Sequence, residues 1–425
     1  MGSIDHCQPH QKEVPGGKCD TAVRSNSRGS WGSRMRKMTL VTMMFLVAAA
    51  ANSMMAMAQD SGFCSEIIEP YILYNCTEYK LTTFDGFQLS IQLVQLMGAP
   101  GIPSRGDVLF LHPSILGGSS WFLASTPIPL AIADAGYSVW IGHTRTTQFS
   151  FGHVQLTPDQ QEYWNWDMDE LANYDLPSFI DFVNGETNGR KFHFVGYSQG
   201  ARVGLSTISY QWNRAAMLSS VTLLAPVVYL QNTLSRVLLA MNYTDMAEIG
   251  YHLGVGMMNF SALVGDTLPA DSQALHDMEN EFLCQLLGPN CCVDPHVAYT
   301  ALTGPYSFTT YKNLAHLTQS MRSEVFMAYD YGSDNSNTEV YQSKIPPQYK
   351  FNEIPTTVPI FVLYGGNDRL STPADMYYMM SALPAQPQIL FNPTYAHLDY
   401  LLSSALMQDV NLPILNFLGK YDNVW

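Results

Sequence analysis

Apolar residues in this chain occur mainly in short continuous runs, separated by longer stretches in which they recur at helical spacing. Runs of the first kind are typical of strands that are buried on both faces. We expect strands at Asp107–Leu111, Tyr137–Gly142, Lys191–Val195, Ser220–Leu224 and Val358–Tyr364, with helices near 121–134, 167–183 and 199–213. This alternation of strand and helix predicts an α/β fold with a mostly parallel sheet flanked by helices.

Two regions depart from this alternation. The runs Lys80–Thr83 and Phe87–Val94 flank Asp85-Gly86, and the second run alternates apolar with polar residues, which predicts an antiparallel hairpin. Residues 229–350 are rich in Met and Tyr and show no clear strand pattern. They predict a helical insertion that caps the carboxyl ends of the strands, where open α/β sheets place their ligands. The predicted core therefore has two parts, 59–228 and 351–425, on either side of the cap.

The first 58 residues have the organisation of a leader. A basic cluster at 34–37 precedes the apolar run Met38–Ala51, and Ala56–Ala58 has the small-x-small form of a signal-peptidase site. This order predicts a signal peptide that is cleaved after Ala58. The alternative is a membrane anchor, but the run is shorter than the ~20 apolar residues that a spanning helix needs. We therefore expect no permanent membrane span after cleavage, and a true start at Met35 or Met38 would bring the basic cluster to the N-terminus.

Composition narrows the class of protein. Hydrophobic residues make up 47% of the chain and charged residues 13%, which indicates a folded protein with a large core. The formal net charge of −15 argues against a nucleic-acid partner, because phosphate binding requires clustered Lys and Arg. A signal peptide places such a chain in the secretory pathway, with the cell exterior or a vacuole or lysosome as its destination.

The cysteines and sequons fit an oxidising compartment. Cys64 and Cys76 predict a short-loop disulfide, and Cys284 is expected to pair with Cys291 or Cys292. Zinc is the competing explanation for clustered cysteines, but a second Cys-x-x-Cys or a paired His is missing, so we predict no metal site. Three Asn-x-Ser/Thr sequons predict N-glycosylation at Asn75, Asn242 and Asn259.

A nucleophile motif follows one of the predicted buried strands. Ser198 lies in the pattern Gly-x-Ser-x-Gly, directly after the strand Lys191–Val195 and directly before a helical stretch. In this context Gly196 and Gly200 allow a sharp turn that exposes the serine hydroxyl. The backbone N–H of Gln199, at the start of the helix, is the expected first donor of an oxyanion hole.

A serine nucleophile needs a base and an acid, and in this architecture they follow the serine in the order acid, then histidine. Asp368 comes just after the strand Val358–Tyr364, and His397 lies ahead of the last predicted helix. Parallel strands bring such loops to one edge of the sheet, so we favour these two residues. The alternatives for the acid are Asp375 and Asp399, which lie elsewhere on the same segment. The alternatives for the base are His112, His143, His153, His193 and His316.

Several longer stretches resemble the acid lipase family of plants and animals, which are α/β-hydrolases with an inserted helical cap. The similar stretches include TTFDGFQLS, GYSVWIGHTR, YWNWDMDELANYDLP, GYSQG, LYGGNDRLS and AHLDYLL, together with the Cys64/Cys76 opening. The resemblance implies hydrolysis of triacylglycerols or other fatty esters, with Ser198, Asp368 and His397 as the triad. It also implies a lipid ester substrate, transient contact of the cap with a lipid surface, and no cofactor.

The loop after the first parallel strand departs from the family pattern. Members of the family usually carry His-Gly-Leu there, and the N–H after the glycine serves the oxyanion hole. This chain has His112-Pro113-Ser114 instead, so the resemblance implies Ser114 as the second donor. Because Pro113 restricts the backbone, we keep a lipid-binding homologue with low turnover as one alternative. A short-chain carboxylesterase or a steryl ester hydrolase, with the same catalytic residues and a different cap, is the other.

Overall fold

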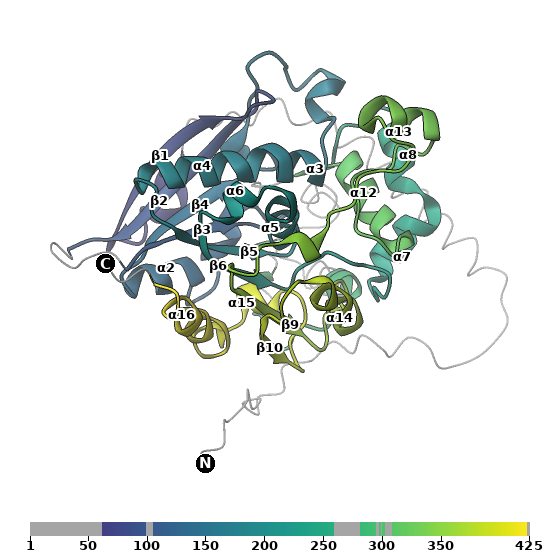
Figure 1. Cartoon of the computed structure of the whole chain (residues 1–425). Helices are drawn as coiled ribbons and strands as arrows, with labels where there is room; N and C mark the ends of the chain where they lie inside the picture. The colour runs from purple at the N-terminus through teal and green to yellow at the C-terminus, as the bar shows by residue number, and fades with distance from the viewer. Residues whose placement is uncertain are drawn as a thin grey trace, which may run out of the picture.

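The structure is a computed structural model that describes residues 62–98, 105–258, 281–294, 297, 298, 300, 301 and 308–422. The predicted leader at 1–58 and the sequon at Asn259 lie outside these residues. Figure 1 shows a central sheet with helices on both of its faces. The predicted α/β fold with a mostly parallel sheet is therefore confirmed.

The sheet has eight strands in the order β1-β2-β4-β3-β5-β6-β9-β10. The strands β1, β2 and β4 pair antiparallel, and every other pair in the sheet is parallel. The predicted entry hairpin is thus formed, by β1 and β2. The strand bounds are β1 Tyr74–Thr82, β2 Gln88–Leu96, β3 Asp107–Leu111, β4 Ser138–His143, β5 Phe192–Tyr197, β6 Leu218–Leu224, β9 Ile360–Gly365 and β10 Gln388–Asn392.

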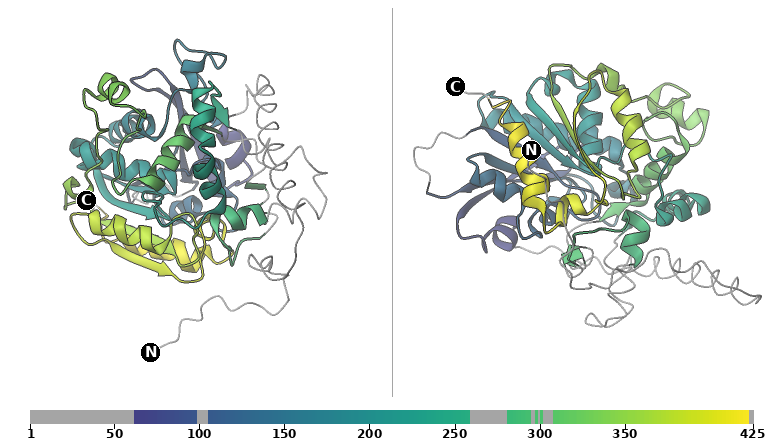
Figure 2. Two further views of the ribbon diagram at one scale, coloured as in Figure 1. Left: turned by 90° about the vertical axis from the view of Figure 1, so that its right-hand side faces the viewer. Right: turned by 90° about the horizontal axis from the view of Figure 1, so that it is seen from below.

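Alternate residues of the central strands pack on opposite faces of the sheet, as the period of two requires. In β3, Val108 and Phe110 belong to one buried apolar cluster, whereas Leu109 and Leu111 belong to the other. The first cluster lies under α2 (Ile128–Asp134) and α16 (Leu412–Leu418), and the right-hand view of Figure 2 looks onto this face. The second lies under α4 (Leu176–Glu186), α5 (Gln199–Tyr210) and α14 (Pro373–Ala382). Burial on both faces explains why these strands read as continuous apolar runs.

Shorter helical elements complete the layers around the sheet. The segment before α4 begins as α3 (Met168–Glu170) and continues through η6 (Leu171–Asp175). Asp167 caps this segment, because its side chain accepts a hydrogen bond from the backbone N–H of Asp169. The remaining short elements are η2 Cys64–Ile68, η3 Gly118–Phe122, η4 Gln148–Ser150, η5 Gln161–Trp164, α6 Trp212–Ala215, η7 Phe351–Glu353, α15 Asp399–Leu402 and η8 Met407–Asn411.

Between β6 and β9 the chain leaves the sheet, and we call residues 225–359 the insertion. Its described helices gather on one side of the molecule, at the right of Figure 1. They include α7 Arg236–Thr244, α8 Met246–His252, α12 Tyr311–Arg322 and α13 Asp334–Tyr341. The sequence showed no strand pattern here, but Met257–Met258 (β7) and Thr309–Thr310 (β8) form a two-residue antiparallel pair. Pairs this short leave no periodic pattern that a sequence could reveal.

Candidate active site

Ser198 lies at the sharp turn between β5 and α5, with φ 56° and ψ −115°. This backbone conformation is strained for a residue with a side chain. The flanking glycines make the turn possible: a Cβ at Gly196 would lie 2.8 Å from the Cα of Ala201, and one at Gly200 would lie 2.3 Å from the carbonyl oxygen of Leu111. The turn therefore brings the start of α5 against the end of β3, where the loop with Ser114 begins.

The structure brings Ser198, His397 and Asp368 into one chain of hydrogen bonds. The Oγ atom of Ser198 lies 2.9 Å from Nε2 of His397, and Nδ1 of His397 lies 2.8 Å from Oδ2 of Asp368. The other carboxylate oxygen of Asp368 accepts the backbone N–H groups of Leu370 and Ser371, both at 2.8 Å. These bonds fix the carboxylate, which in turn fixes the imidazole. All three side chains are buried.

The alternative acids have other partners. Asp375 accepts hydrogen bonds from Asn232 and from Thr372 at the start of α14. Asp399 accepts three backbone N–H groups, from Ala396, Cys291 and Cys292. Burial raises the pKa of Asp399 to about 6, although these three donors oppose the shift. Neither carboxylate is bonded to the imidazole of His397.

The alternative bases are also engaged away from the serine. His153 faces the carbonyl oxygen of Asp85, His193 faces Ser220, and His316 faces Asp167. His143 is fully buried beside Phe63 and Phe149, and neither of its ring nitrogens has a hydrogen-bond partner among the described residues. Burial lowers its pKa well below the usual value.

His112 holds the loop on which Ser114 lies. Its Nε2 accepts the backbone N–H of Thr144 at 3.1 Å, so the ring proton is on Nδ1, which lies 2.7 Å from the carbonyl oxygen of Pro113. Burial lowers the pKa of His112 to about 4, which keeps this ring neutral near pH 7. In a trans peptide the C=O and N–H groups point in opposite directions. The N–H of Ser114 therefore points away from the imidazole.

A largely apolar cavity opens beside the serine. It contains about 1020 Å³ of space free of protein atoms, part of it open to solvent. The core contributes Ser114, Ser198, Gln199 and His397 to its wall, and the insertion contributes mainly apolar residues. The insertion residues on the wall include Leu238 and Met241 of α7, Leu286 and Leu287, and Leu314 and Leu317 of α12. A serine hydroxyl at the edge of an apolar cavity suits a substrate with hydrocarbon chains.

Comparison with known proteins places this site in a family. The chain is 32% identical to triacylglycerol lipase 1 of Arabidopsis thaliana over 361 residues, which cover 84% of this chain and 90% of the relative. The chain belongs to the acid lipase family of α/β-hydrolases. Gastric triacylglycerol lipase of Homo sapiens is a second relative, 28% identical over 82% of this chain and 88% of its own. No family model matches the chain.

Solved structures agree with the fold of this acid lipase family member. A soluble variant of monoglyceride lipase from Saccharomyces cerevisiae matches with a TM-score of 0.50 and 14% identity, over 81% of this chain and 96% of its own. A thermostable carboxyl esterase from Bacillus coagulans also has a TM-score of 0.50, with 13% identity, over 81% of this chain and 98% of its own. At these identities the likeness concerns the α/β-hydrolase fold alone.

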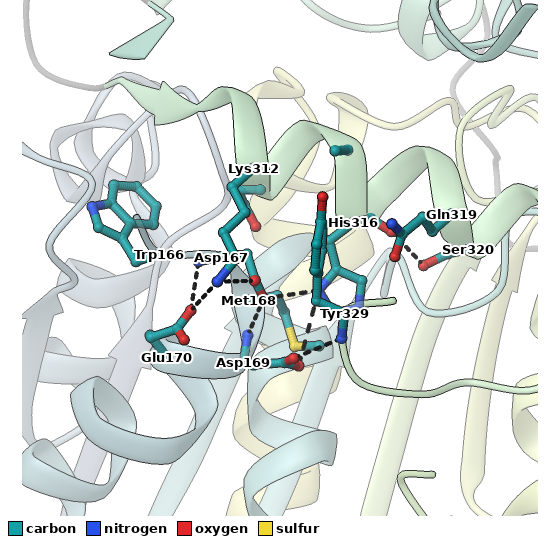
Figure 3. Close-up of polar contacts among 12 residues, drawn as sticks. Trp166, Asp167, Met168, Asp169, Glu170, Lys312, His316, Gln319, Ser320 and Tyr329 are labelled. Carbon is teal, nitrogen blue, oxygen red and sulfur yellow. Dashed lines mark hydrogen bonds and ion pairs between the residues drawn. The ribbon is translucent and has the colours of Figure 1, made fainter. Parts of the chain in front are cut away.

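A buried charge network joins the core of this acid lipase family member to helix α12 (Figure 3). Lys312 and His316 lie one turn apart on α12, and both point toward Asp167 of the core. Nζ of Lys312 lies 2.9 Å from one carboxylate oxygen of Asp167, and Nδ1 of His316 lies 2.9 Å from the other. The opposite face of the helix carries Leu314 and Leu317 to the cavity. The network thus fixes a helix that forms part of the cavity wall.

Both ring nitrogens of His316 face oxygen acceptors, since Nε2 lies 3.0 Å from the carbonyl oxygen of Met327. A neutral imidazole has one N–H, so only the protonated ring donates to both. Burial alone would lower the pKa of His316, but the carboxylates of Asp169 and Asp167 outweigh burial and raise it. Geometry and charge therefore agree on a protonated His316.

One predicted disulfide is formed and one is wrong. Cys64 and Cys76 are bridged, with Cα atoms 5.5 Å apart. Cys291 and Cys292 are thiols rather than halves of a disulfide, so the predicted bridge from Cys284 to Cys291 or Cys292 is not formed. The backbone N–H groups of Cys291 and Cys292 donate to the carboxylate of Asp399.

Two groups of side chains bring together atoms that could bind a metal ion: Asp167, Asp169 and His316, and Cys291, Cys292 and Asp399. In the first group the ammonium of Lys312 already occupies the position of a cation beside Asp167. In the second group both carboxylate oxygens of Asp399 already accept backbone N–H groups. We assign a metal to neither group.

Two of the three sequons fall on described residues. Asn75 is exposed on β1, and Asn242 lies on α7, where its side chain accepts a hydrogen bond from Arg322.

Within the described part of the chain, no helix is long and apolar enough to cross a membrane.

Sequence reasoning missed three residues around the site. His112 was considered only as a base, whereas it holds the Pro113 carbonyl. Tyr197 precedes the serine and contacts His397, and Arg202 lines the cavity one helical turn beyond the serine. Their position beside the nucleophile motif was the available signal, but burial and contact partners cannot be seen in one sequence.

Proposed function

We propose that this chain is a serine carboxylic ester hydrolase of the secretory pathway that acts on triacylglycerols or related fatty esters. The observation that carries the proposal is the hydrogen-bonded chain of Ser198, His397 and Asp368 at the edge of a large apolar cavity. The names of the relatives, which are triacylglycerol lipases, support the same substrate class.

In the proposed mechanism, Oγ of Ser198 attacks the ester carbonyl while Nε2 of His397 takes the hydroxyl proton. Asp368 holds the imidazole and stabilises its positive charge. The imidazolium then gives the proton to the leaving alcohol, which departs and leaves an acyl-enzyme. Water, activated by the same histidine, releases the fatty acid and restores the serine.

The negative charge on the carbonyl oxygen requires donors that are already in place. We propose the backbone N–H groups of Gln199 and Ser114. Gln199 begins α5, where N–H groups have no partner within the helix and the helix dipole favours negative charge. Pro113 leaves the Ser114 N–H intact, and the bond from His112 to the Pro113 carbonyl orients it. This arrangement supports a working oxyanion hole despite the departure from the family pattern.

Residues 229–350 are the proposed cap, between core parts 59–228 and 351–425. Through this cap the protein would contact a lipid surface during turnover. The predicted leader at 1–58 and the Cys64–Cys76 disulfide support a secreted, vacuolar or lysosomal location. N-glycosylation at Asn75, Asn242 and Asn259 is part of the same proposal.

The test compares p-nitrophenyl esters of increasing chain length, and triolein, on the wild-type protein and Ser198→Ala at pH 5 and pH 7. The proposal expects hydrolysis that requires Ser198 and extends to long-chain esters. Turnover limited to short chains would favour a carboxylesterase, and turnover of cholesteryl oleate alone would favour a steryl ester hydrolase. If the wild-type protein hydrolysed no ester faster than the variant, the chain would be a lipid-binding homologue.

A further inference from the structure

Arg202 is a buried arginine on the wall of the catalytic cavity. It follows Ser198 by one turn of α5, which is about 6 Å along the helix axis, and its backbone N–H donates to the carbonyl oxygen of Ser198. The residue is 2% exposed, and it lines the same cavity as Ser198 and His397. The backbone of Arg202 thus lies one helical turn from the reacting serine, and the residue forms part of the same cavity wall.

The guanidinium of Arg202 has few partners. One nitrogen, Nη2, donates to Oγ of Ser320 at 2.9 Å, and the group lies 4.7 Å from the ring centre of Phe326. Its Nε is buried without a hydrogen-bond partner, and no carboxylate among the described residues forms an ion pair with it. Burial lowers its pKa to about 10 although the carboxylates of Asp169 and Asp167 oppose the shift, so the side chain remains charged at neutral pH.

The other fully buried arginine of the described core shows how this protein satisfies such a charge. Arg145 donates five hydrogen bonds, three to Asp175 and two to Asp85, and it packs on the ring of Phe87. One of these five comes from its backbone N–H. Two carboxylates therefore bond to Arg145 directly, whereas Arg202 bonds only to a hydroxyl and feels Asp169 and Asp167 from a distance, without an ion pair. Because an unpaired buried charge costs several kcal/mol, its retention beside an active site indicates a function.

Arg202 is also part of a polar region in the otherwise apolar cavity. Gln199 of α5 and Asn313 of α12 face each other there, and their side-chain amides exchange two hydrogen bonds of 3.3 Å and 3.2 Å. A neutral triacylglycerol offers hydrocarbon chains and ester oxygens, which give a guanidinium no charged partner. The fork of Arg donors matches the oxygens of a carboxylate or a phosphate.

We propose that Arg202 forms a binding subsite for an anionic oxygen group carried by the ester substrate. This inference rests on the proposed ester hydrolysis and narrows its substrate class. A carboxylate at the far end of a short acyl chain and a phosphate on the alcohol share the required chemistry. In either case the anion lies within reach of the arginine side chain while the ester carbonyl lies at Ser198.

Two matched substrate pairs separate these sources. Mono-p-nitrophenyl suberate against p-nitrophenyl octanoate tests an anion on the acyl side, and 1-octanoylglycerol 3-phosphate against 1-octanoylglycerol tests one on the alcohol side. The measured quantity is the kcat/KM for the anionic ester divided by that for the neutral ester. For at least one pair, we expect Arg202→Met to lower this ratio by about 10-fold or more. This is the effect expected when one charge-assisted hydrogen bond is lost. The ratio for Arg202→Lys should lie between those of the wild-type protein and Arg202→Met, because lysine keeps the positive charge but lacks the forked donors of the guanidinium.

Arg214→Met is the matched control, since it removes an arginine that pairs with Asp181 at the surface. It should leave both ratios unchanged. The melting temperature separates binding from a structural role: loss of an unpaired buried charge should leave Arg202→Met at least as stable as the wild-type protein. A large fall in melting temperature with unchanged ratios would mean that Arg202 only holds Ser320 and helix α12, and would overturn the proposal.

A binding measurement keeps the inference separate from the proposed function. On Ser198→Ala, which retains Arg202, we expect monomethyl suberate to bind more tightly than methyl octanoate, although an apolar cavity alone would prefer the neutral ester. If neutral esters are hydrolysed through Ser198 but neither anion is preferred in turnover or binding, the subsite is wrong and the hydrolase stands. If no ester is hydrolysed and the anion still binds more tightly, the hydrolase is wrong and the subsite stands.

Discussion

Tyr197 donates a hydrogen bond of 2.9 Å from its hydroxyl to the backbone carbonyl oxygen of His397. The two rings lie 5.2 Å apart at an angle of 33°. The residue before the proposed nucleophile thus holds the proposed base through both its ring and its hydroxyl. Tyr197 is fully buried and packs on Trp121, so this support is rigid.

We expect Tyr197→Phe to lower kcat by roughly 3–10-fold while KM changes little, because the loss of about 1 kcal/mol of hydrogen bonding loosens the base but not the cavity. The control is Tyr71→Phe, which removes a similar tyrosine bond of 3.0 Å to the carbonyl oxygen of Phe122, far from the site. Both variants should lose stability by similar amounts. Equal kcat values in the two variants would show that the Tyr197 bond is structural only.

The proposed role of Asp368 is tested by Asp368→Asn. An amide there would donate to Nδ1 of His397 and place the ring proton on Nε2, facing Ser198, so the ring could no longer accept the serine proton. We expect kcat to fall by about 10³–10⁴ without a large change in melting temperature. Asp375→Asn, which alters a buried carboxylate bonded to Asn232 and Thr372, should retain near wild-type kcat. The reverse result would make Asp375 the acid.

The sequence predicted the sheet and the three residues Ser198, Asp368 and His397 because local rules determine them. Buried strands appear as apolar runs, and loops after parallel strands meet at one sheet edge. Such rules could not predict that Asp167 contacts Lys312 and His316. Asp167 lies about 150 positions from the other two residues, and their contact depends on how the insertion packs on the core.

Arg202 illustrates this limit most directly. In the sequence it is one arginine in a helical stretch, and such residues usually lie at the surface. Only the structure shows that Ser320 of α12 bonds to it and that no described carboxylate forms an ion pair with it. Tertiary burial, rather than residue type, turns an ordinary side chain into a candidate for ligand binding.

The contact of His112 with Pro113 predicts a role in oxyanion stabilisation. His112→Phe keeps a ring of similar size but releases the Pro113 carbonyl, so the Ser114 N–H loses its fixed direction. We expect kcat to fall by about 10–10²-fold, less than the 10²–10³ for outright loss of a donor. His143→Phe is the control, because it replaces a buried imidazole that has no hydrogen bond to any described residue. A kcat that falls equally in both variants would assign the effect to packing.

The charge network on α12 predicts how stability depends on pH. The folded-state pKa of His316 is raised, because Asp169 and Asp167 outweigh the opposite effect of burial. A raised pKa means that the stabilisation is complete below the unfolded value of about 6.5 and is lost as the pH rises through the folded value. Burial and Asp167 also raise the pKa of Glu170, so the contribution of Glu170 to stability likewise decreases as the pH rises. We therefore expect the contribution of this network to stability to fall between pH 6 and pH 8.

His316→Gln should be less stable than the wild-type protein at pH 5 by about 3 kcal/mol, because it removes one partner of a buried ion pair. This gap should narrow as the pH rises, since the wild-type histidine then loses its own charge. His252→Gln, an exposed histidine at the end of α8, should follow the wild-type curve. Thermal unfolding followed by circular dichroism from pH 5 to pH 8 measures all three curves. A gap that stayed constant over this range would mean that His316 is not protonated in the folded protein, since its contribution would then be independent of pH.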